Sequence, residues 1–314
     1  MFSSRNDHSP GKRFYFGISV IILTAVISAS ALLILTGGTT ADDTTAAAKK
    51  PSAALYGLPA FPSEISIFGE KVPLDQFGIR ERFESELLGV VYSHSSTIRY
   101  MLRSGRFFPD ISAILKEQGM PDDFKYLCVT ESGLANAISP KNAVGFWQFL
   151  SATGVQYGLE ITNEVDERYD FRKSTVAASK YLKEAYGRYK NWTLAAASYN
   201  MGMGGVSNSL NEQLANNYYD LFLNEETSRY ILRIAAVKLV FENPEAYGFG
   251  VKDEQKYQDY KTKDVTVSAT IDNLVTFARQ NGTTYYVLKS LNPWLRSERL
   301  SVRPGKSYIL KLPA

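Results

Sequence analysis

One glutamate combines a chemically useful side chain with an unusual position. Residues 121–131 open with a proline and two acids, a typical helix start. Glu131 falls seven residues after Phe124 and four after Leu127, so its carboxylate lies on the apolar stripe of the predicted helix. Burial disfavours the charged form, and the negative end of a helix that stops just after Glu131 acts the same way, so we expect a raised pKa. A carboxyl group of this kind stays protonated near neutral pH and can serve as a general acid.

Two plainer interpretations of Glu131 remain open at this point. A buried glutamate can be paired with a lysine or arginine, or it can stand at a frayed helix end. Periodicity alone does not choose between these and a catalytic acid.

The sequence has few residues for disulfide bonds, metal binding or a nucleophilic thiol. Cys128 is the only cysteine and cannot form an intrachain disulfide, and with His8 and His94 it does not make a Cys/His metal cluster. A nucleophilic thiol would need a histidine partner, and neither histidine is close in the sequence. We therefore expect acid–base work from carboxylates, tyrosines or lysines, with no metal and no cofactor.

Charge and length narrow the class of protein further. The formal charge of +3 is spread over 35 basic and 32 acidic side chains, without a dense basic block beyond the N-terminus, so no nucleic-acid partner is indicated. A chain of 314 residues with 45% hydrophobic residues can form one large globular domain with smaller attachments. No protein partner can be named.

The elements that must position Glu131 are predicted to be helices. Apolar residues recur at spacings of three and four from Ile79 through Met101, and helices then dominate to about Val240. The expected fold is a compact, mostly α domain. Within it we expect a short third helix at 111–115 and breaks at 119–121, 140 and 202–205.

The character of the sequence changes after Tyr247. Residues 252–263 read as a polar connector, and residues 264–314 as a separate small α+β unit. The expected elements of this unit are a strand at 265–267, helices at 271–278 and 285–291, and a closing strand at 307–312.

The N-terminal part predicts a membrane anchor followed by a tether. Residues 14–35 carry no charge and would span roughly 33 Å as a helix, which matches a bilayer core. Basic residues at positions 5, 12 and 13 precede this segment, so the N-terminus is expected in the cytoplasm and the rest outside. The alternative is a cleaved signal peptide, although the apolar run continues past the small residues at 28–31. Residues 36–52 read as a flexible tether.

A series of short motifs begins at Glu131. In order they are Glu131-Ser132-Gly133-Leu134, Ala143-Val144-Gly145-Phe146-Trp147-Gln148-Phe149, Ala195-Ala196-Ala197-Ser198-Tyr199-Asn200-Met201-Gly202, and Glu226-Thr227 followed by Tyr230. Over about residues 118–245 this series resembles the soluble-lytic-transglycosylase (SLT) domain of lytic transglycosylases. Within that family the series resembles the membrane-bound murein transglycosylase D type.

The resemblance implies a role for each motif residue. Glu131 matches the catalytic acid, and Ser132 the serine that orients the carboxylate or the substrate. The resemblance also implies sugar-binding residues: Gln148, Tyr199 and Asn200 in the cleft, with Glu226 and Tyr230 as second-rank candidates. Trp147 stands where many relatives have methionine, and its ring would either stack on a sugar or lie in the core.

The activity that the resemblance implies is cleavage of peptidoglycan without water. Glu131 would protonate the oxygen between N-acetylmuramic acid and N-acetylglucosamine, and then take the proton from the muramyl C6 hydroxyl as a 1,6-anhydro end forms. A hydrolytic muramidase and a non-catalytic peptidoglycan-binding scaffold are the alternatives. The partners expected are glycan strands and the membrane, with the enzyme domain in the periplasm or cell envelope.

Two other segments have plainer interpretations. The acids at 160, 164, 166 and 170 are interleaved with Arg168, Arg172 and Lys173, which favours a solvated, charge-paired loop over a second catalytic carboxylate. The glycine-rich segment at 202–205 follows an Ala-rich helix and not a strand, so we interpret it as a helix terminator and not as a phosphate-binding loop.

The C-terminal unit resembles a degenerate LysM module. It has the helix, the Leu291-Asn292-Pro293 turn and a closing strand that follows Pro304-Gly305. It lacks the usual Gly-Asp before the first helix. Glycan binding and a purely structural role both remain open for it.

The expected fold class is mainly α. A lysozyme-like helical domain of the goose type is preceded by one transmembrane helix and followed by a small α+β unit. The expected parts are a cytoplasmic N-terminus at 1–13, an anchor at 14–36, a linker at 37–60, the transglycosylase domain at 61–250 with core motifs at 118–245, and the LysM-like unit at 264–314.

Overall fold

The structure, a computed structural model, describes residues 57–314. The predicted anchor at 14–36 lies outside the described residues. Within residues 57–314 we find no helix with the length and apolar character needed to cross a bilayer.

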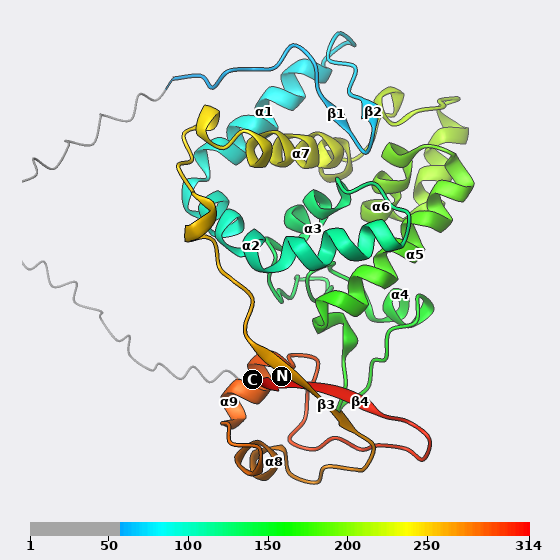
Figure 1. The fold of residues 1–314 in the computed structure, drawn as a ribbon. Coiled ribbons are helices and arrows are strands. Elements are labelled where there is room, and N and C mark those ends of the chain that lie inside the picture. The colour runs from blue at the N-terminus through cyan, green and yellow to red at the C-terminus, as the bar shows by residue number, and fades with distance from the viewer. Residues whose placement is uncertain (1–56) are drawn as a thin grey trace, which may run out of the picture. The chain divides into compact units, whose positions relative to one another are not determined.

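Helices make up most of the described chain, as the sequence predicts (Figure 1). The first part contains β1 (Ser66–Ile67), β2 (Glu70–Lys71), α1 (Ile79–Tyr92), α2 (His94–Glu117), α3 (Phe124–Ser132), α4 (Ser151–Gln156), α5 (Phe171–Tyr189), α6 (Trp192–Glu212) and α7 (Glu225–Glu242). Short 3-10 turns lie at Glu167–Tyr169, Tyr218–Asp220, Glu245–Tyr247 and Asp253–Gln255.

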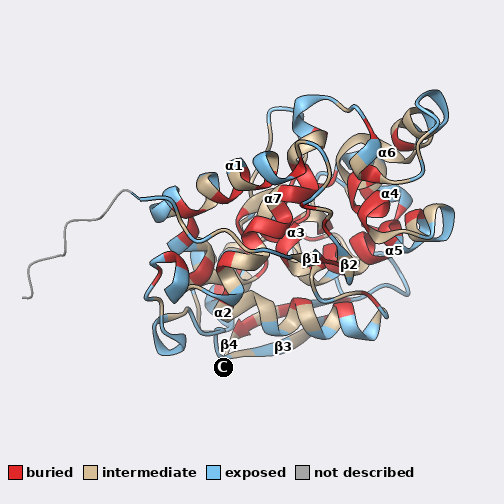
Figure 2. Ribbon diagram, turned by 90° about the horizontal axis from the view of Figure 1, so that it is seen from above, coloured by how far each residue is buried: buried red, intermediate tan, exposed pale blue. Residues whose placement is uncertain are grey.

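One large hydrophobic core joins these helices. Helix α3 packs against α2 and α7, α1 packs along α7, and α5 packs along α6. Figure 2 shows buried residues along α3 and α7, the two elements that will meet at Glu131. Five of the nine residues of α3 are buried, so this short helix is held by its surroundings rather than by its own propensity.

Helix α2 corrects the expectation of a separate third helix at 111–115. The helix runs without a break from His94 to Glu117 and contains Pro109. A proline inside a helix costs about 3 kcal/mol. Burial of Met101 on one side of the proline and of Ile111 and Leu115 on the other keeps both halves in the core, which offsets that cost.

The other predicted breaks are confirmed, with one difference. The chain leaves helical structure at 119–121 and around Pro140. At Gly202 the backbone turns to φ 82 and ψ 150, and then continues as helix to Glu212. The two-residue strands β1 and β2, which pair antiparallel, were not predicted. A strand of two residues offers no periodicity to detect.

The C-terminal unit, residues 262–314, has the predicted order of elements. It consists of β3 (Thr262–Val267), α8 (Leu274–Gln280), α9 (Tyr285–Leu291) and β4 (Tyr308–Pro313). Strands β3 and β4 pair antiparallel from Thr262↔Pro313 to Val267↔Tyr308. Their inner side chains form a second hydrophobic core with both helices, and Val144, Val165 and Tyr169 of the first part belong to that same core.

Candidate active site

Glu131 occupies the last turn of α3, and the backbone after it explains why the helix stops. Gly133 has a φ of 59, and its amide donates to the Val129 carbonyl at 2.7 Å. A Cβ at Gly133 would collide with the ring of Tyr100. Arg103 Nη1 donates to the Gly133 carbonyl at 2.9 Å and so partly neutralises this helix end. The end of α3 is therefore fixed by α2.

The Glu131 carboxyl group is surrounded by protein, although the residue keeps partial contact with solvent. Burial is the main cause that raises its pKa, from the ordinary 4.5 to about 7, and the Glu226 carboxylate acts in the same direction. The hydrogen bond from the Tyr230 hydroxyl to Glu131 Oε1 and the charge of Arg233 lower the pKa, but less. The net result is a carboxyl group that holds or releases a proton near neutral pH.

The alternative in which Glu131 is locked in an ion pair does not describe this site. Among residues 57–314, no lysine or arginine lies within 4.0 Å of the Glu131 carboxylate oxygens. The nearby Arg233 instead pairs with Glu86 through Nε at 2.8 Å, and Arg229 pairs with the same carboxylate.

The sequence analysis did not single out Glu86, which is 4% exposed. Its place beside the apolar stripe of α1, three residues after Phe83, was the available signal. Glu86 thus forms an ion pair with each of these two α7 arginines.

Two tyrosines, the buried Tyr230 and the partly buried Tyr199, lie near the carboxyl group of Glu131. Tyr230 comes from α7 and donates its hydroxyl directly to Glu131. Tyr199 comes from α6 and donates to the Trp147 carbonyl at 2.7 Å. Burial raises the pKa of both hydroxyls well above their usual range, and the nearby Glu131 charge adds to this. Both therefore stay protonated and act as hydrogen-bond donors.

Asn200 and Glu226 connect α6, two residues before its kink at Gly202, to the start of α7. Asn200 Nδ2 donates to Glu226 Oε1 at 3.1 Å, and its Oδ1 accepts from Thr227 Oγ1 at 2.7 Å. Helix α7 begins with an N-cap at Asn224, whose side chain accepts from the Thr227 amide. This pairing holds the Asn200 amide in one orientation and brings the exposed Glu226 carboxylate close enough to raise the pKa of Glu131.

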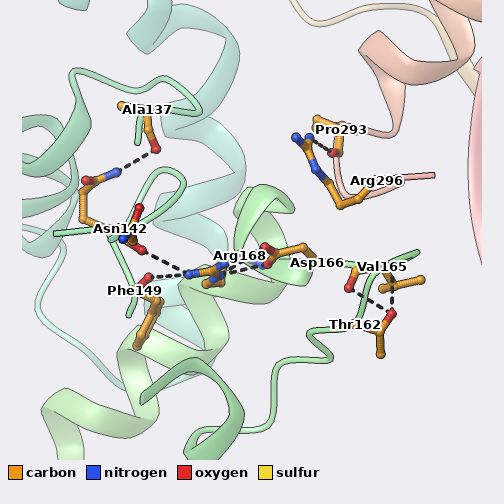
Figure 3. Close-up of polar contacts among 10 residues, drawn as sticks. Ala137, Asn142, Phe149, Thr162, Val165, Asp166, Arg168, Pro293 and Arg296 are labelled. Carbon is orange, nitrogen blue, oxygen red and sulfur yellow. Dashed lines mark hydrogen bonds and ion pairs between the residues drawn. The ribbon is translucent and has the colours of Figure 1, made fainter. Parts of the chain in front are cut away.

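Ser132 and Gln148 organise the loop that follows α3, residues 135–149, called the Gln148 loop from here. Ser132 Oγ donates to the Phe146 carbonyl at 2.8 Å and accepts from the Ala135 amide at 3.4 Å. Gln148 Nε2 donates to the carbonyls of Ala137 at 3.1 Å (Figure 3) and Gly145 at 2.7 Å. Both side chains are thus bonded to backbone, and within residues 57–314 the hydrogen bonds of the Ser132 hydroxyl go to backbone groups and not to the Glu131 carboxyl group.

Trp147 requires a correction. The expectation that its ring stacks on a sugar is wrong for this structure, because the side chain is 0% exposed. Its Nε1 donates to Thr175 Oγ1 at 2.8 Å, and its ring meets Tyr199 edge to face with centroids 6.3 Å apart. The residue is part of the core, and its backbone carbonyl anchors the Tyr199 hydroxyl.

The helix start at 121–124 also differs in detail from the expectation. Asp123 stands at the N-cap of α3, but its side chain does not bond to that helix. It accepts instead from the Phe68 amide at 2.7 Å and from Lys238 Nζ at 2.8 Å. The acid therefore connects the strands and α7 to the start of α3.

Comparison with protein families agrees with this geometry. Residues 110–222 match the model of the "Transglycosylase SLT domain". Residues 263–314 match the "Soluble lytic transglycosylase C-terminal LysM-like domain". Glu131, Ser132, Gln148, Tyr199 and Asn200 fall inside the SLT match, whereas Glu226 and Tyr230 lie just beyond it and are joined to the site by the contacts described above.

The chain is also similar to curated proteins. The chain is 27% identical over 238 residues to the "Membrane-bound lytic murein transglycosylase D" of Escherichia coli K12, and equally to the protein of that name from Escherichia coli O6:H1. The match covers 74% of this chain and 51% of each relative. The chain thus spans about half the length of the curated relatives it matches.

Proposed function

We propose that this chain is a peptidoglycan lytic transglycosylase that uses Glu131 as its single catalytic acid and base. The observation that carries the proposal is the state of the Glu131 carboxyl group. It has a pKa of about 7, it is free of a paired cation among the described residues, and it accepts a hydrogen bond from Tyr230. The SLT domain and the named relatives support the same activity.

The proposed reaction moves one proton out of the carboxyl group and one back. Protonated Glu131 donates to the glycosidic oxygen between N-acetylmuramic acid and N-acetylglucosamine, and the C1–O bond breaks through an oxocarbenium-like transition state. The carboxylate left behind removes the proton from the muramyl C6 hydroxyl. The C6 oxygen then bonds to C1 as a 1,6-anhydro ring closes. Glu131 ends protonated, and no water is consumed.

The residues around Glu131 have proposed supporting roles. The Tyr230 hydroxyl stabilises the carboxylate while it is charged, and Tyr199 adds a second protonated hydroxyl from α6. Asn200 and Gln148 are proposed to contact the N-acetyl groups of the glycan, Gln148 through its Oε1 because its Nε2 is bonded to the carbonyls of Ala137 and Gly145. Ser132 acts on the site through the Phe146 carbonyl and hence through the shape of the Gln148 loop.

Digestion of purified sacculi tests the proposal. Wild type should release muropeptides with 1,6-anhydro ends, which are lighter by one water than the products of a muramidase. Glu131→Gln should lose at least about 100-fold in rate, the usual minimum for removing a general acid. Glu225→Gln is the matched control, because this carboxylate lies on α7 next to Glu226 with its side chain 85% exposed and pairs only with Arg229.

Each alternative makes a different prediction in the same assay. A hydrolytic muramidase would use a second carboxylate, and its products would carry reducing ends. Glu226 is the candidate for that carboxylate, because its charge raises the pKa of Glu131. A non-catalytic scaffold would release no muropeptides as wild type, and an enzyme that does not use Glu131 would keep its turnover in Glu131→Gln. Any of these results would replace the proposal.

We also propose that residues 14–36 anchor the enzyme in the cytoplasmic membrane, with residues 37–60 as a linker to an outward-facing domain at 61–250 and a LysM-like unit at 264–314. The charge pattern of the N-terminal segment and the description of the relatives as membrane-bound support this. The protein should remain in the membrane fraction after a high-salt wash. Complete recovery in the soluble periplasmic fraction would favour signal cleavage instead.

A further inference from the structure

The loop at residues 160–169, called the acidic loop from here, is not the solvated segment that its charges suggest. Asp166 and Glu167 are only 6% and 7% exposed. The loop lies between the Gln148 loop on one side and the C-terminal unit on the other, as the contacts below establish. Its residues therefore lie between the C-terminal unit and the loop that carries Gln148.

Backbone and side chain both bind the acidic loop to the C-terminal unit. Val165 forms an isolated antiparallel bridge with Leu295. Glu164 accepts from the amide of Arg296 through its carbonyl at 2.7 Å, and from the Ser301 amide and hydroxyl through its carboxylate at 2.6 and 3.0 Å. At the start of the loop, the Glu160 carboxylate accepts from Lys306 Nζ at 2.6 Å and from the Tyr308 hydroxyl at 2.9 Å.

Arg168 connects the acidic loop to the Gln148 loop (Figure 3). Its Nη1 donates to the carbonyls of Phe149 at 3.2 Å and Asn142 at 3.4 Å. Its Nε and Nη2 hold the Asp166 carboxylate at 2.7 to 3.2 Å, and the two side chains are only 11% and 9% exposed. The guanidinium group is thus fixed by Asp166 and bonded to the two backbone carbonyls at once.

The backbones of the acidic loop and the Gln148 loop also approach each other closely. A Cβ at Gly145 would collide with the carbonyl oxygen of Arg168, so only glycine fits at this point, where φ is 87. Val144, which precedes Gly145 in the Gln148 loop, packs in the hydrophobic core of the C-terminal unit together with Val165 and Leu295. Phe146 and Trp294 help to line one cavity of about 600 Å³ at this junction.

We infer that Arg168 is a positioning residue through which the docked C-terminal unit sets the shape of the Gln148 loop. The amide and carbonyl of Val144 pair with those of Phe149 at 3.0 and 3.1 Å, and Gln148 sits inside that pairing with a φ of 50. If Arg168 is lost, Phe149 and Asn142 lose their shared donor, and the strained Gln148 backbone loses its support. The C-terminal unit would then act on catalysis by holding the cleft, whether or not it binds glycan itself.

This inference rests on the proposed function where it concerns catalysis, so the experiment combines a structural and a kinetic measurement on the full chain. Hydrogen exchange followed by mass spectrometry reports the protection of residues 137–149. Turnover of defined peptidoglycan strands gives kcat and KM separately. The variants are Arg168→Ala, Arg168→Lys, Glu164→Ala and the double variant Glu164→Ala/Arg168→Ala.

Arg168→Ala should raise exchange at Val144 and Phe149 and lower kcat about tenfold, the effect of one lost hydrogen bond, with a smaller change in KM. Arg168→Lys keeps a cation beside Asp166 and should recover part of the protection and rate, so it remains informative if the alanine variant folds poorly. A purely structural role would lower the amount of folded enzyme without changing kcat per folded molecule.

Glu164→Ala removes the acceptor for Ser301 in the C-terminal unit without touching the Gln148 loop. It should raise exchange in the same segment and lower kcat in the same direction as Arg168→Ala, and it should add little in the double variant, because both changes interrupt one path. Arg299→Ala is the control, since Arg299 pairs with Asp272 inside the C-terminal unit.

Additive effects in the double variant, or unchanged exchange at 137–149 in Arg168→Ala, would overturn the inference. The two proposals fail separately. A wild-type enzyme that releases no anhydro product removes the proposed function, while the exchange data still decide whether Arg168 couples the C-terminal unit to the loop.

Discussion

The raised pKa of Glu131 has a consequence for stability that can be measured without substrate. The folded protein favours the protonated carboxyl group, whereas the unfolded chain titrates near the ordinary 4.5. Below about pH 4.5 both states hold the proton and Glu131 costs nothing. As the pH rises from there to about 7, the unfolded state releases its proton first, so stability is lost, and above about pH 7 the loss is complete.

The size of this effect follows from the interval between the two pKa values. Moving from 4.5 to about 7 corresponds to about 3 kcal/mol, and partial solvent contact of Glu131 reduces this toward about 2 kcal/mol. Glutamine has nearly the same shape, still accepts from Tyr230 and cannot ionise. Glu131→Gln should therefore be more stable than wild type by about 2 to 3 kcal/mol near pH 8, and nearly equal to it near pH 4.

Urea unfolding of both proteins at a series of pH values measures the difference directly. The gap between the two curves should open between about pH 4.5 and 7 and then stay constant. Glu225→Gln, which changes an exposed carboxylate on α7, should show no such gap. A difference that does not depend on pH, or a glutamine variant that is less stable near pH 8, would refute the reasoning that burial dominates the Glu131 environment.

Four further substitutions test neighbouring parts of the site. Glu226→Gln removes a charge that raises the Glu131 pKa, so the alkaline limb of the kcat profile should move to lower pH; an unmoved limb would separate Glu226 from the acid. Tyr230→Phe removes the hydrogen bond that lowers this pKa, so the limb should move to higher pH while kcat falls about tenfold, which a pH–rate profile checks. Trp147→Phe should destabilise the fold by about 1 to 3 kcal/mol in urea with little change in KM, whereas a large rise in KM would restore the sugar-stacking role. Gly145→Ala should cost about 2 kcal/mol or more in the same assay, since its Cβ has no room, and a neutral result would contradict the close approach of the two loops.

Local sequence patterns were sufficient to locate the main elements and to place Glu131 on a buried helix face, while the catalytic role expected for it depended on the resemblance to a family. The apolar stripe of 121–131 predicted both the helix and the burial of Glu131, because helix periodicity and side-chain direction are local properties. The helix at 285–291 and the closing strand of the C-terminal unit were also predicted within a residue, since turn residues bound them clearly.

What the sequence could not supply depends on partners far away in the chain. The choice between a sugar platform and a core residue for Trp147 is made by Thr175 and Tyr199, which lie on α5 and α6. The continuation of α2 through Pro109 depends on the packing of both its halves, and a proline in isolation predicts the opposite.

The acidic loop shows the same limit for charged residues. Its alternating charges are typical of a solvated surface, yet Glu160 and Glu164 are used by residues more than 130 positions later. The local sequence indicates that these charges are paired, but it does not indicate which residues are their partners. The link from the C-terminal unit through Arg168 to the Gln148 loop therefore emerges only from the fold.

Digestion of sacculi in water enriched in ¹⁸O is the most direct test of the central claim that one carboxyl group cleaves the glycan without water. The account predicts anhydro-muropeptides that carry no solvent oxygen, and their near-complete loss in Glu131→Gln. Reducing-end products labelled with ¹⁸O, formed by wild type, would contradict it.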